Sequence, residues 1–147
     1  MLKKFLLILA VFVLFTDCSG KRTEYGSAQI NVIDAMTDAP IAGAKVTVPE
    51  TGESFFTDEN GYTDRMRLPV VPDTEYGRLL EDGAGRITFI VRADGYTPFV
   101  LLYARIAPGC DRTIDVMLFD DDGTLPVFTI IEAPPAEWSE ELMNKYG

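Results

Sequence analysis

The sequence predicts an all-β fold, a sandwich of about seven short strands with a short helix at the C-terminus. Along most of the chain apolar and polar residues alternate with a period of two, the pattern of strands with one buried face. Gly, Asn and Asp separate these runs at short intervals, and the runs themselves show no helical periodicity. Short strands at this spacing favour a sandwich.

The size and charge of the chain set limits on its organisation and partners. Its 147 residues allow one compact domain once an export segment is set aside. The 23 Asp and Glu residues outnumber the 13 Lys and Arg residues, which gives a net charge of −10. Such an acidic surface repels phosphate backbones, so we expect no nucleic acid among its partners.

Residues 1–20 have the order of a secretory signal. Lys3 and Lys4 precede an unbroken apolar run over residues 5–15, and a polar stretch follows. Eleven apolar residues are too few to cross a hydrocarbon core of about 30 Å. We expect export, with the protein secreted or attached to the cell envelope; an uncleaved N-terminal anchor is the alternative.

Cys18 lies just after the apolar run and precedes Ser19 and Gly20. This arrangement resembles the site at which bacterial lipoproteins are cut and acylated, although Asp17 before the cysteine departs from that pattern. Two outcomes stay open: a lipid on Cys18, or ordinary cleavage close to it with release or loose retention. A membrane is therefore expected as a partner only through the signal segment or this lipid.

The second cysteine, Cys110, lies in a turn-like stretch before a predicted strand. In a mature chain without Cys18 it has no internal partner, which leaves a free thiol, an intermolecular disulfide or simple burial. Burial at the start of the strand is the preferred interpretation. A bridge between Cys18 and Cys110 requires that Cys18 survive unmodified.

The chain after the signal divides into three parts. Residues 21–27 are polar and predict a tether, residues 28–119 predict the sandwich, and residues 120–147 predict a C-terminal extension. Strands are predicted around Ile30 and Val32 and at residues 44–48, 53–57, 62–68, 87–93, 98–106 and 112–119. Residues 70–80 form an irregular excursion of the kind that carries binding surfaces.

The pattern also predicts which strand residues are buried and which elements form the C-terminal extension. The alternation predicts that Val46, Val48, Ile90 and Phe99 point into the core. In the extension, residues 120–122 predict a solvated turn, residues 125–131 an added edge strand and residues 137–146 a short helix.

The predicted helix carries an apolar stripe. Trp138, Leu142 and Tyr146 recur every four residues, so they share one face. We expect this stripe to pack on the sandwich, and a partner protein is the alternative.

Several turns carry a family resemblance. They are the turn at Pro40, Gly43-Ala44 before a strand, Thr57-Asp58-Glu59-Asn60-Gly61, and Asp94-Gly95-Tyr96. Over most of residues 28–119 these motifs resemble the carboxypeptidase regulatory-like domain family, which has a transthyretin-like sandwich, and most of all its small exported bacterial members. The resemblance implies that fold and an extracytoplasmic setting, and it implies no reaction. Physically, Gly61 relieves strain in a tight hairpin while Asp58 or Asn60 bonds turn amides.

The chemistry available to the chain is narrow. It contains no His, which excludes His-based acid–base catalysis, Ser-His-Asp and Cys-His sites, and nearly all zinc sites. Acidic residues cluster at 58–64 and 120–122, but both stretches are predicted turns rather than walls of a sugar cleft. We therefore expect no enzymatic activity, no cofactor and no metal; Ca²⁺ at these turns is the alternative to solvated turns.

The function expected from these observations is that of a non-catalytic exported module. It would act as an envelope or cell-surface accessory domain, presenting its loops or an edge strand to a protein or a surface glycan. The alternative is a structural subunit that docks into a larger envelope assembly through its C-terminal tail, with Trp138, Leu142 and Tyr146 at the interface.

Overall fold

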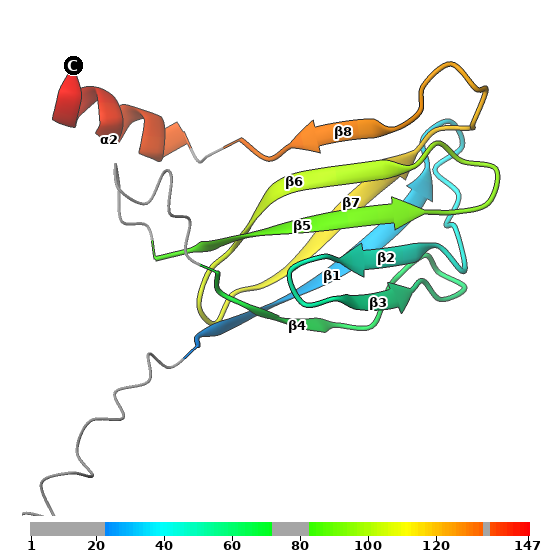
Figure 1. The fold of residues 1–147 in the computed structure, drawn as a ribbon, viewed down its shortest axis with the longest axis horizontal. Helices are drawn as coiled ribbons and strands as arrows, with labels where there is room; N and C mark the ends of the chain where they lie inside the picture. Colours follow the sequence, from blue (N-terminus) through cyan, green and yellow to red (C-terminus); the bar gives the residue numbers. More distant parts are fainter. Residues whose placement is uncertain (1–22, 72–82, 134–135) are drawn as a thin grey trace, which may run out of the picture.

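The computed structural model describes residues 23–71, 83–133 and 136–147. The predicted all-β sandwich with a short C-terminal helix is confirmed (Figure 1). The described elements are β1 (Tyr25–Asp34), β2 (Lys45–Val48), β3 (Glu53–Phe56), β4 (Met66–Pro69), β5 (Gly85–Arg92), β6 (Phe99–Ile106), β7 (Asp111–Leu118), β8 (Phe128–Ile131) and α2 (Ala136–Tyr146). The predicted signal segment, Cys18 and most of the predicted excursion lie outside the described residues.

The strands form two sheets. One has three strands in the order β4-β1-β7, and the other has five in the order β3-β2-β5-β6-β8. Two pairs are parallel, β1 with β7 and β6 with β8, and the remaining neighbours are antiparallel. Among the described helices none is long and apolar enough to cross a membrane.

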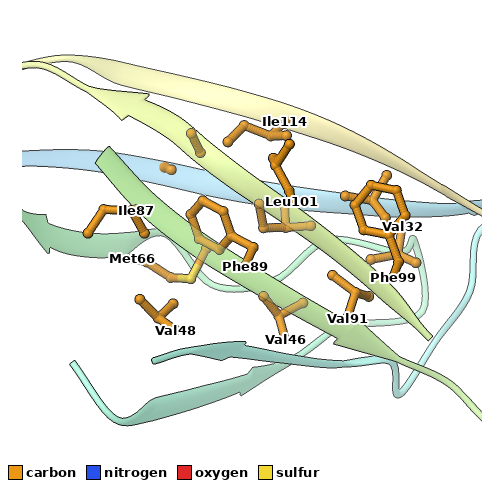
Figure 2. Packing of buried hydrophobic residues seen from close by; sticks show 14 of the residues in the cluster. Val32, Val46, Val48, Met66, Ile87, Phe89, Val91, Phe99, Leu101 and Ile114 are labelled. Atoms are coloured by element: carbon orange, nitrogen blue, oxygen red, sulfur yellow. The ribbon is translucent and has the colours of Figure 1, made fainter. Parts of the chain in front are cut away.

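The core is the apolar layer between the two sheets. Burial alternates along β1, where Ile30 and Val32 are 0% exposed while Asn31 between them is only partly covered. The same period holds in β5, whose Phe89 and Val91 are fully buried. Figure 2 shows these apolar side chains gathered between the strands. The two-residue alternation of apolar and polar side chains therefore corresponds to alternate burial in the strands, as predicted.

The prediction that Ile90 points into the core is wrong. Ile90 is only partly buried, and on the outer face it lies between Thr47 on β2 and Val100 on β6. Its neighbours Phe89 and Val91 take the core positions. Three of the four outward positions of β5 are polar, and Ile90 is the apolar exception. The alternation of the whole strand, rather than Ile90 alone, therefore identifies its core face. The other three predicted core residues are buried: Val46, Val48 and Phe99.

The starts of two strands, β1 and β4, differ most from the prediction. Strand β1 begins at Tyr25, inside the stretch expected as a tether, because its first residues pair with β4. The strand predicted at residues 62–68 is shorter, and Tyr62 forms only an isolated bridge. The reason lies at Thr63, whose hydroxyl accepts the N–H of Ile30 at 3.0 Å while its own N–H donates to the Ile30 carbonyl at 2.9 Å. A side chain thus replaces part of the regular ladder.

A β-bulge interrupts the pairing of β5 with β6. Ile87 pairs with Ala104 and Phe89 with Leu101, so two residues of β6, Leu102 and Tyr103, oppose one of β5. Tyr103 has a φ of 60° and is 42% exposed. A bulged residue in the left-handed region bends the strand. The parallel pairing of β8 with β6 stops beside this bulge, at Leu102.

The observed register generates a stability prediction. Replacing the fully buried Phe89 by Ala should lower the free energy of unfolding by about 3–5 kcal/mol, because it removes a large side chain from the core. Replacing its outward neighbour Ile90 by Ala should cost less than about half of that. Urea unfolding of the two variants measures the difference, and equal losses would contradict the assignment of faces.

Candidate functional site

Four loops gather at one end of the sandwich, the right-hand end in Figure 1. They are residues 35–44, 57–64, 93–98 and 119–127, and together they contain eight Asp or Glu and no Lys or Arg. Loops held on a rigid scaffold are common binding sites. This acidic loop end is therefore the first candidate surface.

Asp34, the last residue of β1, ties two of these loops together. Its Oδ1 accepts the N–H groups of Met36 at 2.8 Å and Thr37 at 2.9 Å, and its Oδ2 accepts the hydroxyl of Tyr96 at 2.9 Å. These bonds, led by that of Met36, lower the pKa of Asp34, and the bond to Asp34 raises the pKa of Tyr96. The negative charge of Asp34 therefore stabilises the contact between these two loops.

Both acidic turns predicted from the sequence are confirmed by their hydrogen bonds. Asp58 Oδ1 accepts the N–H groups of Asn60 and Tyr62, each at 2.9 Å. After β7, Asp122 Oδ1 accepts the hydroxyl and the N–H of Thr124, and the hydroxyl bond is the larger cause of the lowered pKa of Asp122. Carboxylates used in this way stabilise turns.

The described part of the chain holds no group of three or more His, Cys, Asp or Glu side chains that could bind a metal ion. Ca²⁺ takes six to eight oxygen ligands, whereas several loop carboxylates already accept turn N–H groups. The acidic loop end thus carries negative charge, but its carboxylates are not grouped as the ligands of one metal ion would be.

A second surface is the outer face of the three-stranded sheet, called the polar face from here on. Its polar and aromatic side chains are Tyr25, Ser27, Gln29, Asn31, Tyr62, Arg65, Arg67, Asp111, Thr113 and Asp115. The apolar Ile33 and Met117 lie on the same face. Asn31 donates to Asp115 at 2.9 Å, and Ser27 donates to Asp111 at 2.8 Å. Arg65 forms an ion pair with the same Asp111. Amide, carboxylate and guanidinium groups are therefore held in place on one side of the sheet.

Arg67 and Tyr25 mark one end of the polar face. The guanidinium carbon of Arg67 lies 3.5 Å from the centre of the Tyr25 ring, a stacked cation–π contact. Both side chains are exposed. The stack fixes a planar donor group beside an aromatic ring.

The third surface is the free side of β8, called the β8 edge, which borders the five-stranded sheet (Figure 1). On the inner side, the N–H group of Phe128 donates to the carbonyl of Pro98, just before β6, at 2.7 Å, and that of Glu132 donates to the carbonyl of Leu102 in β6 at 3.0 Å. Since successive strand residues direct their backbone groups to opposite sides, Thr129 and Ile131 direct theirs away from β6. No described strand lies beyond them.

The β8 edge differs from the other three strand edges in its chemistry. Strand β3 carries Glu53, β4 carries Arg67 and Pro69, and β7 carries Asp111 and Asp115. Charges and prolines of this kind block the addition of a further strand. Strand β8 has the sequence Phe-Thr-Ile-Ile, without charge or proline. It is the least protected edge among the described strands.

Exposed isoleucines reinforce this difference. Ile131 is 62% exposed and Ile130 is 43% exposed, on opposite faces of the strand. Leu125 and Val127 are also exposed in the segment that leads into β8. The edge therefore combines outward backbone groups with uncovered apolar area.

Three contacts hold β8 in place. Phe128 stacks with Phe99 at 6.0 Å between ring centres and lies 5.3 Å from the ring of Phe119. Arg112 on β7 pairs with Glu132 at 2.9 Å, just after the strand. Together with the ladder to β6, these contacts make the edge a fixed part of the sandwich.

The helix α2 is mostly exposed. None of its residues is buried, although Trp138 and Leu142 are partly covered, and Tyr146 is 60% exposed. The helix is therefore present, as predicted, while the expected packing of the stripe on the sandwich and its alternative assignment as an interface both stay predictions.

Cys110 lies directly before β7 and packs against the core, but it is only partly buried, so the preferred interpretation of burial is met in part. A Cβ at Gly26 would come within 2.8 Å of its sulfur, so Gly26 leaves the room that the thiol occupies. Cys18 lies outside the described residues, and neither its lipidation nor its bridging is tested.

Sequence reasoning placed β8 but missed what makes its edge distinctive. The prediction of an added edge strand is confirmed, but the order of strands in a sheet depends on contacts between distant segments, and no local pattern states that β8 pairs with β6. One local signal was available: the run over residues 125–131 contains no charged residue in a chain that is rich in them.

No protein-family model and no curated protein matches the chain. Among solved structures it is similar to catechol 1,2-dioxygenase from Acinetobacter sp. ADP1, with 18% identity over 78% of this chain and 60% of that one, at a TM-score of 0.48. It is also similar to a type II cohesin–X-dockerin complex from Acetivibrio cellulolyticus, with 21% identity over 67% of this chain and 59% of that one, at a TM-score of 0.42. The chain thus spans about three fifths of the length of either neighbour.

The Asp34 cluster generates a pH prediction. The folded state lowers the pKa of Asp34 below its ordinary value of 3.8, so its stabilisation is present above that value and is lost as the pH falls through the folded pKa. The variant Asp34→Asn should be less stable than the wild type at neutral pH, and the difference should shrink on acidification.

Urea unfolding midpoints over a range of about pH 2.5 to 7 measure this difference. Asp94→Asn, which changes an exposed aspartate in a neighbouring turn, is the matched control. A difference between Asp34→Asn and wild type that stays constant with pH would contradict the prediction.

Proposed function

We propose that the protein is a non-catalytic binding module of the bacterial cell envelope and that it binds another protein through the β8 edge. The observation that carries the proposal is an uncharged border strand with exposed isoleucines on both faces. A strand added from another protein supplies backbone hydrogen bonds to such an edge, and pockets for alternate side chains give specificity.

The non-catalytic part of the proposal is supported by the residues themselves. The chain has no His, which removes the commonest general base. Asp34, Asp58 and Asp122 hold turns through hydrogen bonds. Carboxylate oxygens that already accept backbone N–H groups are poorly placed to exchange protons with a substrate.

The extracytoplasmic setting is proposed from residues 1–20, which have the order of an export signal. The tether would be a lipid on Cys18, or the mature protein would be released after cleavage near that residue. In either case the apolar edge would meet proteins outside the cytoplasm, and a lipid on Cys18 would keep it beside envelope proteins.

We also propose membership of the carboxypeptidase regulatory-like domain family. The turns that carry the resemblance have the backbone that their glycines permit: φ is 73° at Gly43, 82° at Gly61 and 83° at Gly95. At Gly61 a Cβ would also lie 2.6 Å from the carbonyl oxygen of Val32. The backbone at all three positions favours glycine, and at Gly61 the space requires it, which supports the motif as a structural one.

The alternative role, a structural subunit that docks through its C-terminal tail, is a variant of the same proposal. The β8 edge belongs to that tail, and exposed Met143 and Tyr146 on α2 extend its apolar area. A binding module and an assembly subunit would differ in the permanence of the contact, since obligate interfaces are larger and more apolar.

The polar face favours a second candidate, a surface glycan. Planar amide, carboxylate and guanidinium groups beside Tyr25 and Tyr62 are the groups that hydrogen-bond sugar hydroxyls and stack on sugar rings. The Arg65–Asp111 pair and the Arg67–Tyr25 stack hold several of these groups before any ligand binds.

The protein-binding proposal predicts position-specific crosslinking in cells. A photoreactive residue at position 129 on the β8 edge should give a covalent protein adduct when the full chain is expressed in a bacterial host. The same residue at position 113 on the exposed edge strand β7 is the matched control and should give little adduct. Equal adduct at both positions, or none at position 129, would sink the proposal.

The glycan candidate predicts loss of binding on a different surface. If envelope polysaccharide binds the purified protein, Arg67→Ala should weaken that binding by about 10-fold or more, because it removes the stacked donor. Ile131→Lys, on the β8 edge, should leave it unchanged. Affinity electrophoresis in polysaccharide gels compares the variants, and unretarded wild-type protein would exclude this candidate.

A further inference from the structure

We infer that the strand received by the β8 edge is β8 of a second copy of this chain, running antiparallel about a two-fold axis through Ile130. This inference rests on the proposed function, because it names the partner of the same edge. The two five-stranded sheets would then join into one continuous sheet across the dimer.

The backbone geometry of β8 fits pairing with itself. The residues that direct their N–H and carbonyl groups outward, Thr129 and Ile131, lie symmetrically on either side of Ile130. In an antiparallel pair, opposite residues of this kind exchange both hydrogen bonds. Thr129 of each copy would therefore pair with Ile131 of the other copy, and all outward groups of both residues would be satisfied.

The side chains also match in this register. Ile130 would face Ile130 of the second copy as a pair without mutual hydrogen bonds, the arrangement in which cross-strand side chains come closest. Ile131 would lie beside Thr129 of the second copy on the outer face. The exposed apolar area of both isoleucines would be covered by the same contact.

Charge does not oppose this contact, although the chain as a whole carries −10. Residues 125–131 contain no charged side chain. Glu132, the first charge after the strand, is paired with Arg112 at 2.9 Å within its own copy. In the antiparallel register Glu132 would oppose Phe128 and not another Glu132, so the axis brings no like charges face to face.

The expected dimer is weak. Two four-residue strands bury far less than the roughly 1,600 Å² of a standard interface. We expect a monomer in dilute solution and a growing dimer fraction as the concentration rises, with Ile131→Lys weakening the association at least about 10-fold. Sedimentation equilibrium of wild type and this variant measures both.

Disulfide trapping tests the register itself. In a Cys110→Ser background, Ile130→Cys should oxidise to a covalent dimer, because residues facing each other across a close antiparallel pair have the spacing of a disulfide. Thr129→Cys should form at least about 10-fold less dimer, because residue 129 faces residue 131 of the second copy and the two introduced cysteines would be two residues out of register. An equimolar mixture of Thr129→Cys and Ile131→Cys should form the mixed dimer. Any bridge through Cys18 would be common to all variants.

The outcomes separate the inference from the function on which it rests. Preferential trapping of Ile130→Cys, with unchanged thermal unfolding of the reduced variant, would establish the self-paired register. No more dimer than in the background would overturn the inference. If crosslinking at position 129 in cells then gives an adduct heavier than the chain by some other mass, the binding function stands with a different partner, and no adduct at all overturns both.

Discussion

The apolar layer between the two sheets is the constraint on which the rest of the structure depends. Because every second residue of β1 and β5 must enter that layer, a slip of either strand by one residue would turn all of its core side chains outward. The remaining residues of each strand then point to the outer face of the sheet. The rows of polar groups on the three-stranded sheet and the outward position of Ile90 both follow from what the core requires.

The C-terminal extension depends on the same core. Phe128 reaches the rings of Phe99 and Phe119, and this contact, with the ladder to β6, brings β8 into the sheet. By pairing with β6, strand β8 satisfies the backbone groups on that side of β6. Its own backbone groups on the opposite side then have no neighbouring strand among the described residues. The candidate binding edge is thus a consequence of how the sandwich closes, and its lack of charge is what distinguishes it from the borders at β3, β4 and β7.

Sequence patterns predicted most of the fold because strands with one buried face alternate visibly. They failed at Ile90, an apolar residue on the otherwise polar outward side of β5, and where a side chain replaced a backbone bond, as at Thr63. The left-handed Tyr103 in the bulge left no sequence signal, since glycine is the residue expected there. For the candidate site, the sequence predicted an added edge strand over residues 125–131, whereas its pairing with β6 arises from long-range contacts that no local pattern contains.

The most direct test of the central claim is amide hydrogen exchange, residue by residue, along β8 in dilute protein. An open edge requires alternation: the N–H groups of Phe128 and Glu132, bonded beside β6, should exchange slowly, while those of Thr129 and Ile131 should exchange much faster. Slow exchange at all four residues would mean that another part of the chain already covers the edge, and it would contradict the account.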